Sequence, residues 1–116
     1  MALNVYGMSG CTTVKRAQDW LAEHGVEHSY THYNKLADVA DTLQRLIDAA
    51  SLTAVLNTNS QAFKKLDVAS QDNLLHDQAA AVQAMAANPR LAKRPIAFDG
   101  KRVLSGFKTA EWQSLL

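Results

Sequence analysis

The stretch LNVYGMSGC, residues 3–11, decides the fold, because a strand, a turn and a cysteine follow one another in it. Its first residues alternate between apolar and polar side chains and stop at Gly7, a pattern typical of a short β-strand. The residues after Gly7 are turn-forming and lead to Cys11. We therefore expect Cys11 to lie where a strand ends and a helix begins.

An amphipathic helix is expected directly after Cys11, followed by a second strand. Apolar residues recur there at helical spacing, at Val14, Ala17 and Leu21. Thr12 or Thr13 is the expected cap of this helix, and Gly25 is a suitable stop. Residues 26–33 predict the second strand. The first 33 residues thus predict a parallel strand-helix-strand unit.

The middle of the chain is expected to be helical. Residues 36–50 carry an amphipathic stripe. Residues 73–87 predict a second, Ala-rich helix with Asp72 as its cap, and Asn88-Pro89 ends it. Residues 51–65, which lie between these helices, are expected to be irregular.

The last quarter of the chain predicts two strands and a helix. Residues 95–98 predict a strand, and Asp99-Gly100 is a dipeptide typical of a type I′ hairpin turn. Residues 101–105 are the expected return strand. Thr109 is then expected to cap a short terminal helix that runs through Leu116.

Together these elements predict an α/β fold in a single domain, residues 1–116. A βαβ unit and a ββα unit that share one mixed sheet make a thioredoxin-like fold. An all-helical subdomain is inserted between them at approximately residues 35–92. The chain has 116 residues, of which 47% are hydrophobic and 20% charged, and this length and balance suit one globular domain.

Charge and hydropathy exclude two classes of partner. The net charge is +1 and no more than two basic residues are adjacent, so the basic footprint of a nucleic-acid-binding protein is absent. No stretch is long and apolar enough to cross a membrane, and the first residues lack the pattern of a signal peptide. We expect a cytoplasmic protein, most simply a monomer, with no nucleic-acid or membrane partner.

Cys11 is the single cysteine of the chain and the first candidate for chemistry. One thiol can neither form an internal disulfide nor build a zinc site of the cysteine-pair type, so redox chemistry needs a second thiol from another molecule. The first N–H groups of a helix lack intrahelical partners and stabilise a thiolate beside them. Gly10 lets the backbone approach a bound group closely. The alternative is an inert, buried cysteine.

The segment Lys93-Arg94-Pro95-Ile96 is the second candidate. An X-Pro bond is held in cis at a cost of only about 0.5–1 kcal/mol, so Arg94-Pro95 is a candidate cis bond that would turn Arg94 toward Cys11. The guanidinium would then pair with an oxyanion or a carboxylate, and a surface loop is the alternative. Lys15 and Arg16 lie in the first helical turn, where a nearby anion would offset the unfavourable dipole, although ordinary solvent-exposed residues are the alternative.

These motifs resemble the arsenate reductase-like family (the ArsC/Spx superfamily), and in particular its YffB-type subgroup. That subgroup commonly reads Y-G-x-x-x-C-D-T-V-K-K-A-x-x-W-L, and residues 6–21 of this chain read YGMSGCTTVKRAQDWL. Further matches follow in the same order, at His32-Tyr33, Leu56-Asn57, Phe63-Lys64-Lys65-Leu66, Asn88-Pro89, Lys93-Arg94-Pro95-Ile96 and Gly106-Phe107. The resemblance thus covers nearly the whole chain.

The resemblance implies a thioredoxin-like fold and a thiol-dependent, glutathione-linked reductase. Cys11 would be the nucleophile, and its target a disulfide, a glutathione mixed disulfide or an arsenate-like oxyanion. Glutathione or a glutaredoxin-type reductant would resolve the adduct, and no bound cofactor is expected. Anion and thiol-ligand binding would fall to Gly10, Thr12, Thr13, Val14, Lys15, Lys64, Arg94 and Pro95.

The chain also departs from the pattern of the arsenate enzymes. These carry a histidine four residues before the cysteine, where this chain has Gly7, and an arginine in the inserted domain, where the nearest equivalents are Asn59 and Lys64. One arginine and one or two lysines make a thin site for a highly charged oxyanion. The alternative is an Spx-like regulator that binds a protein without catalysis, although the Cys-x-x-Cys switch of many such regulators is excluded because its second position is Val14.

No metal site is expected. The chain has four histidines and one cysteine. His28 and His32 share a strand face but lie about 13 Å apart at the rise of a strand, which is too far for one metal ion.

Overall fold

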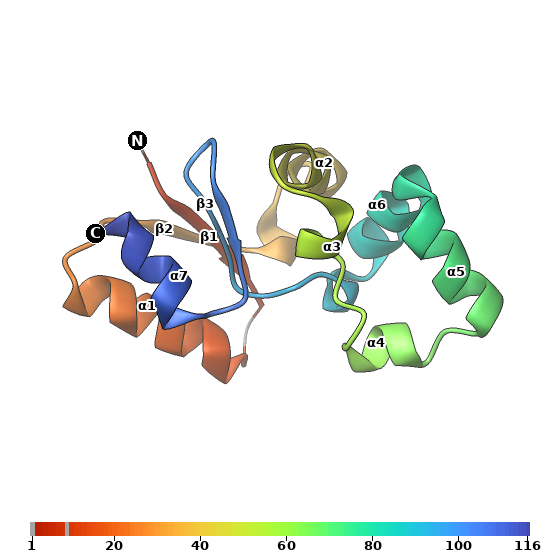
Figure 1. Ribbon diagram of the computed structural model, residues 1–116, viewed down its shortest axis with the longest axis horizontal. Helices are drawn as coiled ribbons and strands as arrows, with labels where there is room; N and C mark the ends of the chain where they lie inside the picture. Colours follow the sequence, from red (N-terminus) through yellow and green to blue (C-terminus); the bar gives the residue numbers. More distant parts are fainter. Residues whose placement is uncertain (1, 9) are drawn as a thin grey trace. The chain divides into compact units, whose positions relative to one another are not determined.

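The structure is a computed structural model that describes residues 2–8 and 10–116. The chain divides into two compact units, seen in Figure 1. The chain up to Leu36 forms the first unit together with Arg94–Leu116, and Ala37–Lys93 forms the second. Both ends of the chain therefore belong to one unit, and the second unit is a single continuous segment. That the whole chain folds as one domain stays a prediction.

A four-stranded mixed sheet forms the centre of the first unit. Its strands are β1 (Asn4–Gly7), β2 (Ser29–His32), β3 (Ile96–Phe98) and β4 (Val103–Ser105), in the order β2-β1-β3-β4. β1 runs parallel to β2 and antiparallel to β3, and β3 is antiparallel to β4. The thioredoxin-like fold that the sequence predicts is thus confirmed. β2 is shorter than the predicted residues 26–33, because it begins at Ser29 and a 3₁₀-helix, η1 (Tyr33–Lys35), begins directly after it.

Two helices, α1 (Thr12–Glu23) and α7 (Thr109–Trp112), cover one face of this sheet (Figure 1). The buried core between helices and sheet consists of Leu3, Val5, Ala17, Leu21, Ala97 and Trp112. The fully buried Trp112 donates a hydrogen bond from its indole Nε1–H to the carbonyl of Gly106, at 3.0 Å. The first and the last helix therefore share one core, which joins the two ends of the chain.

Local signals set the ends of these elements, with two corrections. α1 ends at Glu23 and is followed by Gly25 with a φ of 67°, as predicted. Thr109, however, is the first residue of α7 and Lys108 its cap, so the predicted capping role of Thr109 was wrong. A 3₁₀-helix, η3 (Gln113–Leu115), ends the chain.

The hairpin between β3 and β4 also differs from the prediction. A type I′ turn needs two residues with positive φ, but Gly100 has a φ of 96° and no described residue other than glycine has a positive φ. The Asp99 carboxylate holds the loop instead, because it accepts hydrogen bonds from the backbone N–H groups of Lys101 and Arg102. These bonds, with the Arg102 side chain, lower the pKa of Asp99 to about 2.

The second unit consists of helices. They are α2 (Val39–Ala49), α3 (Leu52–Val55), α4 (Gln61–Lys64), α5 (Val68–His76), α6 (Gln78–Ala87) and the 3₁₀-helix η2 (Pro89–Leu91). Each α-helix of this unit begins at a side chain that accepts a hydrogen bond from the backbone N–H three residues later, at Asp38, Ser51, Ser60, Asp67 and Asp77. These N-cap hydrogen bonds therefore determine where each α-helix of the second unit begins.

Two sequence predictions for this unit were wrong for the same reason. Residues 51–65 are not irregular but contain α3 and α4, because Ser51 and Ser60 start a helix each. The single helix predicted over residues 73–87 is two helices, since Asp77 ends α5 and caps α6.

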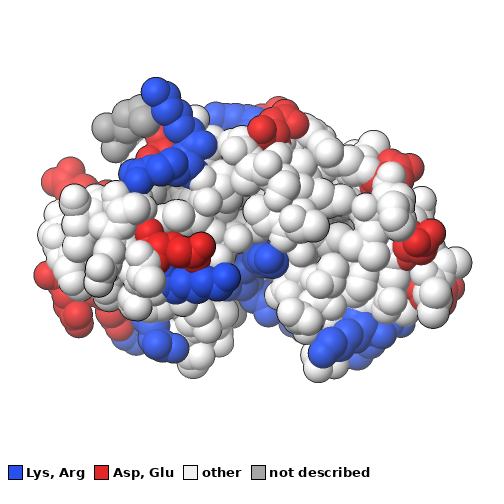
Figure 2. Space-filling view, viewed as in Figure 1, with Lys and Arg blue, Asp and Glu red and all other residues white. Residues whose placement is uncertain are grey.

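The surface mixes both signs of charge. Figure 2 shows acidic and basic side chains interspersed among uncharged ones on the face in view. Within the described residues, no helix has the length and apolar character that a membrane span requires.

Candidate functional site

Cys11 is the N-cap residue of α1. Its backbone is extended, with φ −87° and ψ 112°, and its carbonyl accepts a hydrogen bond from the N–H of Lys15 at 3.2 Å. The predicted cap at Thr12 or Thr13 was therefore wrong, because the helix begins at Thr12 and Cys11 holds the cap position. The partly exposed thiol makes no capping hydrogen bond within the described chain. A side chain at this place lies next to the unpaired N–H groups of the first helical turn.

The register of the sheet brings Arg94 to the same end of the sheet. Tyr6 pairs with Ile96 in the antiparallel β1–β3 ladder, so continuing the register by two residues sets Arg94 opposite Met8. The Nη1 of Arg94 indeed lies 3.7 Å from the Sδ of Met8. The peptide bond between Arg94 and Pro95 is cis, in agreement with its choice as a candidate. Since Met8 lies in the connection between β1 and Cys11, the guanidinium borders the loop that carries the thiol.

Tyr33 is a buried tyrosine whose phenol is influenced by the charge of Arg94. The Tyr33 side chain is 1% exposed, and its ring centroid lies 6.3 Å from that of Tyr6. Burial strongly raises the pKa of Tyr33, and the positive charge of Arg94 opposes this increase. The phenol of Tyr33 therefore stays protonated, next to a permanent cation.

A second tyrosine, Tyr30, lies on β2 and reaches the position of Gly7 at the end of β1. Tyr30 pairs with Val5 in the parallel β1–β2 ladder and packs against the core under α1. Burial raises the pKa of Tyr30, and the negative charge of the Cys11 thiolate raises it further. The two groups are thus near enough to influence each other electrostatically. Neither Tyr30 nor Tyr33 was a predicted site residue. The alternation of Tyr30 and His32 along one strand face could have indicated that Tyr30 lies beside the end of β1.

The sequence matches the model of the ArsC family over residues 6–115. The chain belongs to the ArsC family. An uncharacterized protein of Haemophilus influenzae is 32% identical over 112 residues, which are 97% of this chain and 96% of that protein. The global transcriptional regulator Spx of Streptococcus pyogenes serotype M3 is 30% identical over 111 residues, 91% of this chain and 78% of the regulator.

Solved structures agree with this membership in the ArsC family. A YffB protein superposes with a TM-score of 0.86 at 33% identity, over 98% of each chain. An arsenate reductase (ArsC) related protein from Brucella melitensis gives a TM-score of 0.78 at 34% identity, over 98% of this chain and 93% of that chain. These similarities confirm the family resemblance derived from the sequence motifs.

Gly7 leaves no space for a side chain at the end of β1. A β-carbon added at Gly7 would lie 2.8 Å from Cγ2 of Val14 and 3.2 Å from Cε1 of Tyr30. Both distances are shorter than ordinary van der Waals contact, so α1 and Tyr30 close over this position only because it has no side chain. A histidine at this position would require Val14 and Tyr30 to move.

Three further cations considered for anion binding have other neighbours or belong to the other unit. The Nζ of Lys15 lies 2.8 Å from Oδ2 of Asp19, with both side chains largely exposed, and this hydrogen bond raises the pKa of Lys15. Arg16 lies over the ring of Phe107, 5.8 Å from its centroid. Lys64 is the last residue of α4, in the second unit. The anion-binding roles of Lys15 and Lys64 stay predictions.

The structure therefore gathers part of the predicted site at one end of the sheet. Gly10, Cys11, Thr12, Thr13 and Val14 lie in or directly after the connection between β1 and α1. Arg94 lies opposite Met8, next to Pro95. The described residues contain no group of three or more His, Cys, Asp or Glu side chains that could hold a metal ion.

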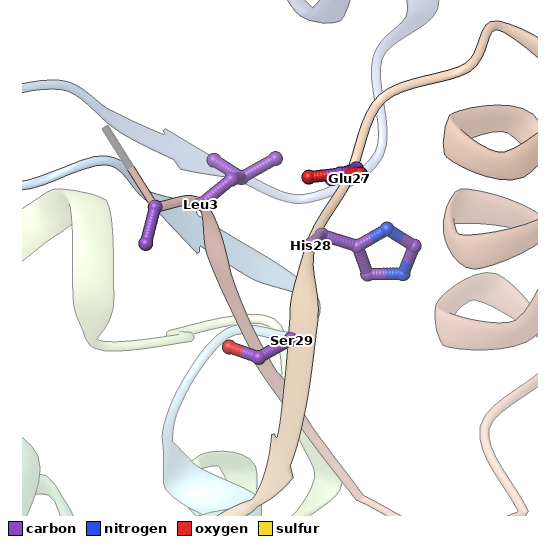
Figure 3. A pocket seen from close by; sticks show the side chains of 5 residues that line it. Leu3, Glu27, His28 and Ser29 are labelled. Atoms are coloured by element: carbon purple, nitrogen blue, oxygen red, sulfur yellow. The ribbon is translucent and has the colours of Figure 1, made fainter.

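A separate cavity lies at the other end of the same sheet. Its volume is about 290 Å³ and Ala2, Leu3, Glu27, His28 and Ser29 line it (Figure 3). Leu3 directly precedes β1 and Ser29 begins β2, whereas Cys11 follows the end of β1. This cavity is therefore distinct from the candidate site.

Proposed function

We propose that this ArsC-family chain is a thiol-dependent reductase in which the Cys11 thiolate is the nucleophile and glutathione resolves the adduct. The observation that supports this most directly is the position of Cys11, a partly exposed thiol that caps α1 without a capping hydrogen bond. The Arg94 guanidinium, 3.7 Å from Met8 in the loop before Cys11, adds a permanent positive charge near the thiol.

The proposed reaction proceeds in two thiol–disulfide exchanges. The Cys11 thiolate attacks the glutathione sulfur of a mixed disulfide, so that a new S–S bond forms and the other sulfur leaves as a thiolate. The thiolate of a free glutathione then attacks the Cys11–glutathione disulfide, which yields oxidised glutathione and restores Cys11. The second thiol comes from solution because the chain has a single cysteine.

The charge at the site favours a carboxylate or a singly charged group. Arg94 can hold one such group through two parallel hydrogen bonds. Arsenate-like oxyanions are the other electrophiles in this proposal, and two glutathione thiols would then supply the two electrons of the reduction. Such chemistry needs a compartment with a reduced glutathione pool, in agreement with the expected cytoplasmic location.

Turnover of the mixed disulfide of glutathione and 2-hydroxyethanethiol tests the proposal. We expect Cys11→Ser to abolish turnover and Arg94→Ala to raise KM about ten- to hundredfold, because a charged hydrogen bond is lost. Arg102→Ala is the matched control, since Arg102 binds Asp99 and Ser114. Full activity of Cys11→Ser would overturn the proposal, as would a wild type that turns over neither this disulfide nor arsenate.

The second candidate function is that of an Spx-like regulator which binds a protein partner without catalysis. The 30% identity to the Spx regulator supports it. This function predicts that Cys11→Ser keeps its biological activity in a complementation assay, whereas the reductase function predicts that the activity is lost.

A further inference from the structure

We propose that the hydroxyl of Tyr30 is a ligand-binding group of the Cys11 site, which donates a hydrogen bond to an acceptor oxygen of the glutathionyl group attached to Cys11. This inference rests on the proposed function and adds a specificity-determining residue to it. Among the described residues, three observations support it: the direction of the ring, the missing side chain at Gly7, and the lack of another hydrogen-bond partner for the hydroxyl.

The direction of the Tyr30 ring follows from the strand register. Tyr30 pairs with Val5, and Gly7 is the next residue of β1 on the same face of the sheet. Cε1 of Tyr30 lies 3.2 Å from the position of a β-carbon on Gly7. The ring therefore extends along the sheet from Val5 toward Gly7. Because Cε1 is bonded to the carbon that bears the hydroxyl, the hydroxyl lies near the end of β1, where the chain turns toward Cys11.

Gly7 allows the Tyr30 ring to extend toward the end of β1, because it has no side chain. Any side chain at position 7 would fill the space between Tyr30 and Val14, the third residue of α1. The tyrosine thus supplies a polar group at the end of β1 from the neighbouring strand, where position 7 supplies none. The missing side chain at position 7 and the position of Tyr30 are parts of one structural feature.

The hydroxyl of Tyr30 is open to a ligand. It has no hydrogen-bond partner within residues 2–8 and 10–116, and the ring is only partly buried. Burial raises the pKa of Tyr30, and the negative charge of Cys11 as a thiolate adds to this increase. A phenol that stays protonated at neutral pH is a hydrogen-bond donor.

Three groups then surround the bound ligand from different elements. Cys11 at the start of α1 supplies the sulfur, Arg94 before β3 supplies a cation, and Tyr30 on β2 supplies a neutral donor. Glutathione offers a matching set, because its thiol lies between carboxylates and amide carbonyl oxygens. A small thiol without carbonyl oxygens would use the sulfur alone.

Equilibrium glutathionylation of Cys11 tests this inference without turnover. Wild type and Tyr30→Phe are equilibrated with reduced and oxidised glutathione, and intact-mass spectrometry gives the fraction of the Cys11–glutathione disulfide. Because phenylalanine keeps the ring over Gly7, a change reports on the hydroxyl. We expect a glutathionylation constant about five- to tenfold lower in Tyr30→Phe, as one hydrogen bond is lost.

The same measurement with diethyl disulfide, which has no oxygen that could accept a hydrogen bond, is the matched control, and we expect equal constants for both proteins. Equal glutathionylation constants in wild type and Tyr30→Phe would overturn the inference, and so would an equal loss with both disulfides, since that would indicate a structural effect. The outcome is independent of the turnover assay, so failure of the reductase proposal and failure of this inference are distinguishable.

Discussion

At the scale of single residues, the candidate site after β1 depends on two residues. Cys11 supplies the thiol, and Gly7, which has no side chain, allows Val14 and Tyr30 to pack closely. Gly7 is buried, and its neighbours Val14 and Tyr30 would lie 2.8 and 3.2 Å from an added β-carbon. We predict that Gly7→Ala lowers the free energy of unfolding by about 1–3 kcal/mol, because a methyl group overpacks this contact. Urea denaturation followed by circular dichroism measures the change.

Val14 provides the control for this prediction. Its two γ-carbons lie 2.8 and 3.1 Å from the added β-carbon, so removing them gives the methyl group room. The cost of Gly7→Ala should therefore be smaller in a Val14→Ala background than in the wild type, in a double-mutant cycle. An undiminished cost in that background would contradict the packing explanation.

At the scale of elements, the boundary between α5 and α6 is determined by Asp77. Its carboxylate accepts a hydrogen bond from the N–H of Ala80 at 3.1 Å and caps α6. We predict that Asp77→Ala lowers the free energy of unfolding by about 1 kcal/mol, through loss of this cap. Asp72, which the sequence suggested as the cap, forms an exposed pair with His76 instead. Asp72→Ala should therefore change stability by less than about 0.5 kcal/mol.

Thermal and urea unfolding of both aspartate variants decide between the two positions. A larger loss for Asp72→Ala than for Asp77→Ala would show that the Ala-rich segment behaves as one helix in solution.

At the scale of the whole molecule, Trp112 of α7 packs in one core with residues of β1 and α1 and so connects the two ends of the chain. It is fully buried in the core with Leu3, Val5 and Leu21, and its indole binds the Gly106 carbonyl. We predict that Trp112→Ala lowers the free energy of unfolding by about 3–5 kcal/mol. This is a large part of the free energy of unfolding of a typical domain, which is about 5–15 kcal/mol. The urea midpoint should fall, and the amides of β1 should exchange faster with deuterium.

Leu116 is the matched control, because its side chain is 63% exposed. Leu116→Ala should leave the urea midpoint nearly unchanged. Protection of the β1 amides that survives Trp112→Ala would show that the first strand does not depend on the terminal helix.

The sequence predicted those features that depend on local patterns. Alternation and helical spacing in the first 33 residues predicted β1, α1 and β2, and the last quarter predicted β3, β4 and α7. The strand-turn-helix pattern and the Arg-Pro dipeptide made Cys11 and Arg94 the candidates, and the family resemblance gave them their expected roles. Caps were predicted poorly, at Thr12, Asp72 and Thr109. α1 and α7 begin after Cys11 and Lys108, which make no side-chain capping hydrogen bond, so the preference for Ser, Thr and Asp at this position did not apply there.

From sequence alone followed the order of the strands with α1 and α7, the thioredoxin-like class, and the rule that redox chemistry at Cys11 would need an external thiol, since the chain has one cysteine. Tertiary structure alone decided that Arg94 lies opposite Met8, that Tyr30 extends over Gly7, and that Lys15 binds Asp19. The physical reason is that strand register and side-chain direction join residues far apart in the chain. Such pairings depend on the packing of the sheet against its helices, which no local pattern encodes.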